Sequence, residues 1–435
     1  SNNLFDKPDS VRRIDLGGVQ ISEHVYQYDG LGRTAEEVDA AGNWTRYEYD
    51  AFNRMTKTIL PDSSEIVREY VAHNKEDLPI KISVNGQVLG EQAFDGLDRM
   101  TVSITGGRKS VYSFAPGQRQ PKSVTRPSGN QTGYAYKPEL GDEPAQRIAV
   151  ESTATYEYDS QNARLLRTVE LNTTLERRYF SSGELKSEHI SHAGEEPYVM
   201  GYEYSLNARL LSYTDVLGQT QTYEYDDFTR LKSTRLGLLC STFGYDAHGQ
   251  LTRIETVDEA GGNTQRLCID LEYDEFGRER KRTFDLGAGI VQTLEQTYDE
   301  VDRLIQRTLS NGSEELRDEY YNYDSRSRLC DYKCSGSQVP VDPYGKSIQC
   351  QVFGFDAVDN ITFVETTFEG GRNESCYEYG NIFDPCPLTA LTNSFQPDYP
   401  ARLEFDYDAD GNLIRDEAGR TLTYDSLGRL SSISV

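Results

Sequence analysis

A nine-residue pattern, aromatic-x-Tyr-Asp-x-x-Gly-Arg-Leu, recurs from one end of this 435-residue chain to the other. Clear copies begin with YQYDGLGR at residues 26–33 and YEYDAFNR at residues 47–54, and others lie at 223–231, 271–278, 321–329 and 422–430. Random order of the 30 Tyr and 35 Asp residues would give about two Tyr-Asp pairs, but the chain has ten, and Phe94 and Phe355 begin two Phe-Asp copies. The chain is therefore an array of repeats, and such a fold grows by adding similar units.

The repeats have a nearly constant length. We place the second aromatic residue of each copy at positions 28, 49, 70, 94, 114, 136, 158, 180, 204, 225, 245, 273, 298, 323, 355, 379, 407 and 424. Five of these positions, 70, 114, 136, 180 and 379, rest mainly on spacing. The mean period is about 23 residues, as expected for stacked supersecondary units. Residues 1–435 are therefore predicted to form a single repeat array and not two or three separate globular domains.

Each copy is predicted to form a β-hairpin. In aromatic-x-Tyr both rings lie on one face of a strand, because side chains alternate along it. The Asp that follows begins a turn, in which its carboxylate accepts hydrogen bonds from the next backbone amides. Three residues after Asp, ten of the 12 clearest copies have Gly, Asn or Asp, which tolerate the left-handed conformation that closes a short hairpin loop. These ten residues are Gly32, Asn53, Asp98, Asn162, Gly249, Gly277, Asp302, Asp359, Gly411 and Gly428.

The segments between the copies complete the unit. An Arg follows the left-handed position in eight copies, and we expect it to pair with the Asp of a neighbouring repeat and so tie consecutive turns together: Arg33, Arg54, Arg99, Arg230, Arg278, Arg303, Arg328 and Arg429. A second turn separates the copies, as at residues 39–43, 127–130, 215–218 and 258–263. A single hairpin is marginal in water, so the hairpins are expected to pair edge to edge into a long, curved antiparallel sheet. The predicted fold class is all-β.

Composition limits the partners of this sheet. The 30 Tyr and 16 Phe residues suit a pleated, half-buried surface. The net charge of −26 argues against binding to nucleic acid or to an anionic membrane surface. No apolar run approaches the roughly 18–20 residues that span a bilayer, and the first residues, SNNLFD, lack the features of a signal peptide. The seven Cys residues are odd in number and lie in the second half, so they do not resemble a disulfide framework.

The copies resemble the YD repeats of the Rhs and toxin-complex proteins of bacteria and of the teneurins of animals. The resemblance runs from about Tyr26 to Leu430, and FDYDADGNL at 405–413 followed by YDSLGRL at 424–430 is very similar to the bacterial form. It implies that the repeats wind as a β-sheet spiral into a hollow shell. For a bacterial member it also implies that the shell encloses a C-terminal toxin until delivery.

Two features depart from the bacterial pattern. The family closes its shell with an Asp-Pro-x-Gly-x-x-Gly segment linked to self-cleavage before the toxin, and repeat sequence here continues to Val435 without one. We therefore expect a fragment, or one half of a two-part shell, without the self-cleaving segment and the toxin. Asp342-Pro343-Tyr344-Gly345 resembles the start of that motif, but Ile348 replaces its last Gly, and a loop between strands is expected there. The longer spacings at 323–355 and 379–407 predict inserted loops.

No residues are assigned to catalysis, to a cofactor or to a metal. The five His residues form no metal signature, and surface or turn positions are expected: His24, His73, His189, His192 and His248. Cys330 and Cys334 have neither redox nor zinc spacing, so buried or incidental thiols are expected, with a disulfide as the alternative. Trp44 is expected to pack at the start of a strand. Six Asn-x-Ser/Thr sites matter only in a glycosylating host.

The leading hypothesis is structural encapsulation. The chain would be a shell segment of a bacterial Rhs or toxin-complex protein, made in the cytoplasm and exported as part of a toxin assembly. Its partners would be the enclosed toxin domain and either a second shell chain or a delivery apparatus. The alternative is a cell-surface adhesion or carbohydrate-binding module, in which exposed, coplanar Tyr rings stack on sugars, whereas rings buried between strands would count against it. An enzyme would need a polar cluster that breaks the repeat pattern.

Overall fold

The computed structural model describes residues 6–72, 74–260, 265–396 and 398–434. Apart from one short 3-10 turn, η1 (Pro138–Leu140), the regular elements in these ranges are all strands. The strands of the first half are β1 (Ser10–Ile14), β2 (Gln20–Tyr28), β3 (Thr34–Val38), β4 (Trp44–Tyr49), β5 (Met55–Ile59), β6 (Glu65–Tyr70), β7 (Pro79–Val84), β8 (Gln87–Phe94), β9 (Met100–Thr105), β10 (Arg108–Ser113), β11 (Ser123–Thr125), β12 (Gln131–Lys137), β13 (Glu143–Ile148), β14 (Thr153–Tyr158), β15 (Leu165–Glu170), β16 (Thr173–Tyr179), β17 (Leu185–His192), β18 (Tyr198–Tyr204), β19 (Leu210–Thr214) and β20 (Thr220–Tyr225). Those of the second half are β21 (Leu231–Leu236), β22 (Leu239–Tyr245), β23 (Leu251–Asp258), β24 (Gln265–Tyr273), β25 (Glu279–Asp285), β26 (Val291–Tyr298), β27 (Leu304–Asn311), β28 (Glu314–Tyr323), β29 (Leu329–Ser335), β30 (Ile348–Phe355), β31 (Ile361–Phe368), β32 (Gly371–Glu378), β33 (Ala390–Asn393), β34 (Arg402–Glu404), β35 (Asp406–Tyr407), β36 (Leu413–Arg415), β37 (Thr421–Tyr424) and β38 (Leu430–Ser434).

The strands form one continuous meander. From β1 to β34 every strand pairs antiparallel with the next strand in the sequence, which makes a 34-stranded sheet. The last strands, β35 to β38, pair in the same way in a separate four-stranded sheet. The all-β prediction is therefore confirmed, and the chain folds as a succession of hairpins.

Two kinds of hairpin turn alternate along the chain, as the sequence predicts. The YD turns follow the second aromatic residue, and the return turns join one hairpin to the next. In the YD turn at Asp29 the amide donates to the Arg33 carbonyl at 2.9 Å. The return turn at Asp39 has the same bond to the Asn43 carbonyl, also at 2.9 Å. The predicted return turns at 127–130 and 215–218 are present too, whereas the one at 258–263 extends beyond the described residues.

The residue three positions after Asp has a positive φ in nine of the ten predicted cases. The exception is Asn162, where the following residue, Ala163, takes the left-handed conformation with φ 57° because this loop is one residue longer. In the two clear copies without Gly, Asn or Asp, the residues Thr229 and Ser327 take it instead, with φ 76° and 62°. The turn geometry therefore imposes this conformation even on residue types that disfavour it.

A β-bulge recurs beside the second aromatic residue of the hairpins. In the pairing of β4 with β5 the register shifts between Glu48 and Tyr49, and the same shift occurs between Arg178 and Tyr179. Tyr179, and not Phe180, is therefore the second aromatic residue of that repeat, and our placement at 180 is wrong by one residue. Phe180 replaces the turn Asp, since its amide donates to the Glu184 carbonyl at 2.9 Å. A bulge bends its strand and increases the local twist, so a bulge in nearly every repeat curves the whole sheet.

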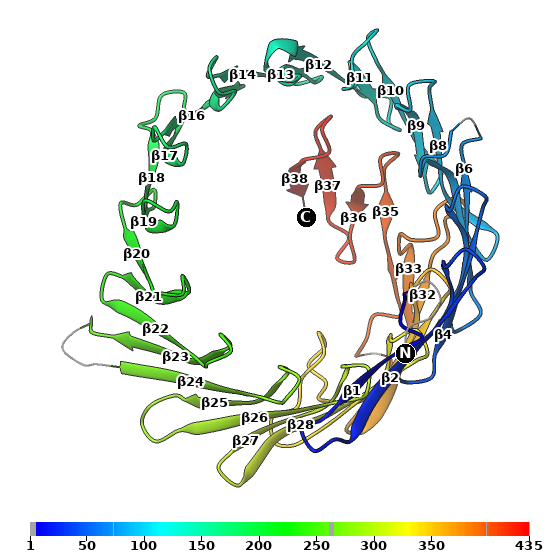
Figure 1. Ribbon diagram of the computed structural model, residues 1–435, viewed down its shortest axis with the longest axis vertical. Coiled ribbons are helices and arrows are strands. Elements are labelled where there is room, and N and C mark those ends of the chain that lie inside the picture. The colour runs from blue at the N-terminus through cyan, green and yellow to red at the C-terminus, as the bar shows by residue number, and fades with distance from the viewer. Residues whose placement is uncertain (1–5, 73, 261–264, 397, 435) are drawn as a thin grey trace.

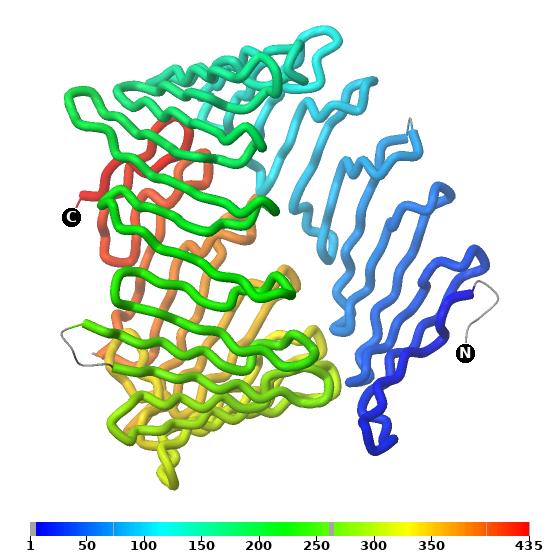
Figure 2. Tube along the Cα trace, turned by 60° about the vertical axis from the view of Figure 1, so that its left-hand side comes forward, coloured from blue at the N-terminus to red at the C-terminus, as the bar shows by residue number. Residues whose placement is uncertain are grey.

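The curved sheet winds past its own beginning. Figure 1 shows the strands passing from β1 over β10 to β14, down through β16 to β24, and back along β25 to β28 to the N-terminal strands. Figure 2 shows the same path from the side, as a band of hairpins wound into a spiral. The C-terminal strands thus begin a second turn next to the first.

The wall of this spiral is one sheet thick. Its accessible surface is 25069 Å², whereas a compact monomer of 49.2 kDa would expose only ~16,800 Å². Few side chains are fully buried as a consequence, and one of the small clusters of buried apolar residues contains Tyr332, Cys334 and Ile348.

The two inserted loops predicted from long spacings are present and pack together. One joins β29 to β30 and the other lies between β32 and β34. Tyr344 in the first and Tyr399 in the second have ring centroids 4.6 Å apart. Lys346 also donates to Asp398 at 2.6 Å. The predicted loop at Asp342 is a tight turn, with its amide bonded to the Lys346 carbonyl at 2.9 Å.

Candidate functional site at the seam between turns

Each YD turn is organised by its aspartate. The Asp29 carboxylate accepts hydrogen bonds from the amides of Leu31 and Arg33, both at 2.9 Å, and from the Arg33 guanidinium at 2.6 Å. The amide bond from Arg33, together with its guanidinium, holds the pKa of Asp29 below its ordinary value. The carboxylate acts as the predicted turn former. The same amide and guanidinium bonds recur at Asp50, Asp95, Asp226, Asp274, Asp299, Asp324 and Asp425.

The arginine of the turn connects consecutive repeats, but the predicted pairing with an aspartate of the next repeat occurs only in some of them, as at Arg278 with Asp302 (2.6 Å) and Arg328 with Asp359 (2.9 Å). Arg33 pairs with the aspartate of its own turn and not with that of the neighbour. Its Nη1 atom donates to the backbone carbonyl of Asp50 in the next turn at 3.0 Å, and its guanidinium lies over the Tyr49 ring at 4.7 Å. The arginine four residues after the aspartate is close enough to close its own turn, and each of the eight arginines keeps this local partner.

Tyrosine hydroxyls form a second ladder, which the sequence analysis did not find. The Tyr49 hydroxyl donates to the Thr34 carbonyl of the preceding hairpin at 2.9 Å, and burial raises the pKa of Tyr49. A preference for Tyr over Phe at this position is the only sequence signal for these bonds. The same bond is made by Tyr28, Tyr70, Tyr136, Tyr158, Tyr179, Tyr225, Tyr245, Tyr273, Tyr298, Tyr323, Tyr379, Tyr407 and Tyr424.

Side chains 259 to 300 residues apart meet where the second turn of the spiral lies against the first. We call this line of contacts the seam. At its beginning, Arg13 binds the Asp302 carboxylate at 2.6 Å and donates to the Glu300 carbonyl at 2.9 Å. The Leu16 amide donates to the Glu275 carboxylate at 2.7 Å. Thus hairpin return turns in the first turn of the spiral contact YD hairpin turns in the second turn of the spiral.

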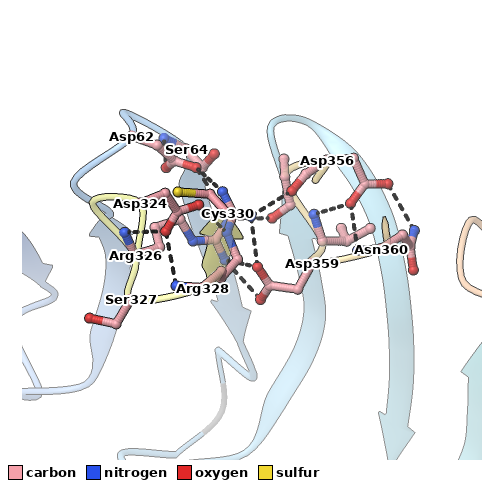
Figure 3. A network of polar contacts seen from close by, with 12 residues as sticks. Asp62, Ser64, Asp324, Arg326, Ser327, Arg328, Cys330, Asp356, Asp359 and Asn360 are labelled. Carbon is pink, nitrogen blue, oxygen red and sulfur yellow. Dashed lines mark hydrogen bonds and ion pairs between the residues drawn. The ribbon is translucent and has the colours of Figure 1, made fainter. Parts of the chain in front are cut away.

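An arginine network continues the seam (Figure 3). Arg326 in a YD turn reaches the Asp62 carboxylate at 3.3 Å and binds Asp359 of the next YD turn at 2.9 Å, and Arg328 lies 3.7 Å from Asp62. Burial alone would raise the pKa of Asp62, but hydrogen bonds from Ser64 and the charge of Arg326 outweigh it and lower that pKa. Asp62 therefore stays ionised and holds two arginines of the other turn.

The part of the second inserted loop that lies between β32 and β33 also packs against the first turn of the spiral. Its Asp384 carboxylate is 4% exposed and pairs with Arg108 of the first turn. Gly106 and Gly107 have φ values of 55° and 76° and lie directly against Asp384 and Phe383. A β-carbon at either glycine would overlap these side chains. We call the contact of Gly106, Gly107 and Arg108 with Phe383 and Asp384 the latch. It requires a glycine at positions 106 and 107.

The seam ends near the last strands. Ser128 donates its amide to Asp410 at 2.8 Å, and Ser426 donates its amide to Glu151 at 3.1 Å. Farther along, Arg429 lies 3.3 Å from Glu170. Exposed ion pairs of this kind contribute about 0–1 kcal/mol each, so the seam is held by the sum of many weak contacts.

The residues weighed in the sequence analysis do not come together in one place. His189 and His192 both lie on β17, three positions apart and so on opposite faces, and each contacts a hydroxyl group of Ser187 or Thr173. His24 is half-buried on β2, His248 is exposed in a YD turn, and His73 lies outside the described residues. Trp44 begins β4, as predicted.

The thiols and carboxylates likewise form no reactive centre among the described residues. All seven cysteines are free, so Cys330 and Cys334 form no disulfide, and Cys334 is buried. No group of three or more His, Cys, Asp or Glu residues in the described ranges could hold a metal ion. No helix in those ranges is long and apolar enough to cross a membrane.

The comparisons with solved structures agree with the spiral. The crystal structure of TcdB2-TccC3 superposes with a TM-score of 0.73 at 13% identity and covers 100% of this chain and 26% of the solved one. TcdB2-TccC3 without its hypervariable C-terminal region gives 0.66 at 13% identity, with 98% and 28% covered. The Photorhabdus luminescens Tc holotoxin pore gives 0.55 at 13% identity, with 95% and 24% covered. This chain thus spans about a quarter of the solved chains that it matches.

Sequence comparison identifies the family. No curated protein sequence matches this chain significantly. The model of the Teneurin YD-shell family matches residues 9–347, which is more than three quarters of the chain. The chain therefore belongs to the teneurin YD-shell family.

Proposed function

We propose that this chain is a wall segment of a hollow shell that encloses a toxin polypeptide and keeps it from the cell that makes it. The observation that carries this proposal is a sheet one layer thick that winds past its own beginning and is joined to itself along the seam. A wall of this kind surrounds a space, whereas a compact fold fills its interior with side chains. The role is mechanical, without a catalytic step.

The likeness to TcdB2-TccC3 supports the kind of cargo and partner. We propose that the cargo is a C-terminal toxin domain, and that a second shell chain or a delivery apparatus completes the assembly. The protein would be made in the bacterial cytoplasm and exported as part of this toxin assembly. Its net charge of −26 argues against nucleic acid as a partner.

The packing of the tyrosine ladder weighs against the alternative of a sugar-binding surface. The ladder rings are half-buried, their hydroxyls are engaged with the preceding hairpin, and arginines cover several of them, such as Arg230 at 4.4 Å from the centre of the Tyr245 ring. Stacking on a sugar needs a free ring face, which these contacts occupy.

Two measurements test the proposal. Electron-microscopy images of the purified chain should show a ring-shaped, hollow particle, and a solid globule would contradict the wall role. Protease treatment of the natural full-length protein that carries this segment should leave an enclosed polypeptide undigested. Digestion of that polypeptide at the rate of an unfolded chain, with the repeats intact, would contradict encapsulation.

A further inference from the structure

Two different kinds of contact hold the wall together. Within each turn of the spiral, neighbouring strands share continuous backbone ladders, such as the seven residue pairs that join β26 to β27. Across the seam, the contacts reported above for the described residues are made by side chains, and all of them except the packing of Phe383 against Gly107 use an arginine or a carboxylate. Backbone hydrogen bonds therefore join the wall within each turn of the spiral, whereas mainly charged side chains join one turn to the next.

We infer that the wall opens along the seam, and that ionic strength controls this opening while the hairpins within each turn stay paired. The inference rests on the proposed role as a wall, since it names the place where the wall gives access to its interior. It assigns a conformational function to contacts that would otherwise only stiffen the spiral.

Salt distinguishes the two kinds of contact. The Debye length falls from about 10 Å at 0.1 M salt to about 3 Å at 1 M, and partly exposed charges are screened most. The side chains of Arg13 and Asp302 are 28% and 48% exposed, and those of Arg429 and Glu170 are 52% and 21% exposed. Backbone ladders between neutral amides do not depend on ionic strength in this way.

The apolar contacts described at the seam are small or partly electrostatic. Concentrated salt strengthens hydrophobic contacts, so a seam with a large apolar interface would close more tightly. In the latch, however, Phe383 remains 68% exposed although it lies against Gly107. Phe276 meets the first turn through the guanidinium of Arg13, whose centre lies 5.0 Å from the ring, and this contact is also electrostatic in part.

Residue-resolved hydrogen exchange of the whole chain tests the inference. Among the residues that the structure describes, three amides donate across the seam, those of Leu16, Ser128 and Ser426. Between 0.05 M and 1 M NaCl we expect their exchange to become about tenfold faster, which corresponds to ~1.4 kcal/mol. The hydrogen-bonded amides of β26 and β27 should keep their rates. If the seam amides show no salt dependence, or if they exchange together with the ladder amides, the inference is overturned.

A pair of adjacent arginines provides matched variants. Arg13→Gln removes a seam contact and should speed exchange at Leu16 in low salt, whereas Arg12→Gln removes only the pair with Glu23 inside the first hairpin and should not. Equal effects of the two variants would contradict a specific role of the seam. Circular dichroism of both variants shows that the sheet is intact. A hollow particle whose seam ignores salt would refute this inference alone, whereas a solid particle would refute the wall role as well.

Discussion

The YD turns at the seam and those at the opposite edge of the first turn of the spiral have the same local structure but different surroundings. We call this opposite edge the free edge. Phe276 and Phe228 both lie two residues after the turn aspartate, and each has the arginine of its own turn over its ring, at 5.4 Å and 5.0 Å. Phe276 is half-buried and also receives Arg13 from the other turn, whereas Phe228 is 76% exposed. The equivalent Leu31, Phe52 and Leu97 are exposed in the same way.

This difference shows that one turn motif has two uses. Its internal hydrogen bonds close the hairpin wherever the motif occurs. The residue two positions after the aspartate, which we call the outer residue, contacts another part of the chain only where a neighbouring turn of the spiral lies beside it. The position of a repeat around the spiral therefore decides its role, and the variants below compare the two regions.

The largest difference is expected for the turn aspartate itself. Asp324→Ala removes a carboxylate that accepts from the Arg326 and Arg328 amides and pairs with the Arg328 guanidinium, and both arginines also reach Asp62 across the seam. We expect a loss of roughly 3 kcal/mol in the free energy of unfolding, measured by urea denaturation.

The matched change on the free edge is Asp226→Ala. It removes the same turn bonds to Phe228 and Arg230, but the described residues give this turn no seam contact in addition. A loss of about 1.5–2 kcal/mol is expected. If the two variants lose equal stability, the seam adds nothing to the turn.

A second comparison uses two glycines in return turns. Gly106 and Gly42 both have positive φ, 55° and 83°, but Gly106 lies against Asp384 while nothing is within 4 Å of the β-carbon position at Gly42. Gly42→Ala should cost about 1 kcal/mol through backbone strain alone. Gly106→Ala should cost about 2–3 kcal/mol, because it also displaces Asp384 from Arg108.

The loss at Gly106 has a local signature as well. Hydrogen exchange in the 106–108 and 380–386 segments should increase in Gly106→Ala and stay unchanged in Gly42→Ala. Equal stability losses with unchanged exchange in the latch would show that strain, and not the seam contact, explains the cost.

The local structure could be predicted from the sequence, and the seam could not. The spacing of Tyr, Asp and Gly identifies the hairpins because most YD turns close within five residues, as from Asp29 to Arg33. The seam joins residues such as Arg13 and Asp302, whose proximity depends on the bend added by every bulge between them. No single repeat contains that information.

Two smaller errors have the same physical origin. The arginine was expected to bind an aspartate of the next turn, which Arg278 and Arg328 do, but Arg33 binds its own aspartate four residues away and reaches the next turn through the Asp50 carbonyl. The aromatic residue was placed at Phe180 on spacing, although the bulge register selects Tyr179. In both cases the sequence pattern left two candidates, two partners for Arg33 and two positions for the aromatic residue. The local backbone geometry of the turn selects one of them.

The outer phenylalanines test the free edge directly. Phe276→Ser removes the ring that Arg13 and Arg278 share, so we expect a loss of about 1 kcal/mol and faster exchange at the Leu16 amide. Phe228→Ser, on an exposed ring, should change the free energy of unfolding by less than about 0.5 kcal/mol. A large loss at Phe228 would show that the free edge makes contacts of its own.

The smallest effect is the pH dependence of one seam pair. Burial alone would raise the pKa of Asp302, but hydrogen bonds from Arg13 and Arg278 outweigh it and lower that pKa below its ordinary value of 3.8. A carboxylate with a lowered folded-state pKa stabilises the fold above its unfolded pKa and loses this effect as the pH falls through the folded-state value. The contribution should therefore be complete at pH 5 and above and disappear only below about pH 3.8.

A double-mutant cycle of Asp302→Asn and Arg13→Gln isolates this contribution from all other titrating groups. At pH 7 the coupling free energy should be favourable and below about 1 kcal/mol, since both side chains are partly exposed. At pH 3 it should shrink, because the Asp302 carboxylate of the unfolded chain is then mostly protonated and forming the ion pair must release that proton. A coupling that is the same at both pH values would mean that the pair is held by shape and not by charge. The charge-based description of the seam would then fail at this pair.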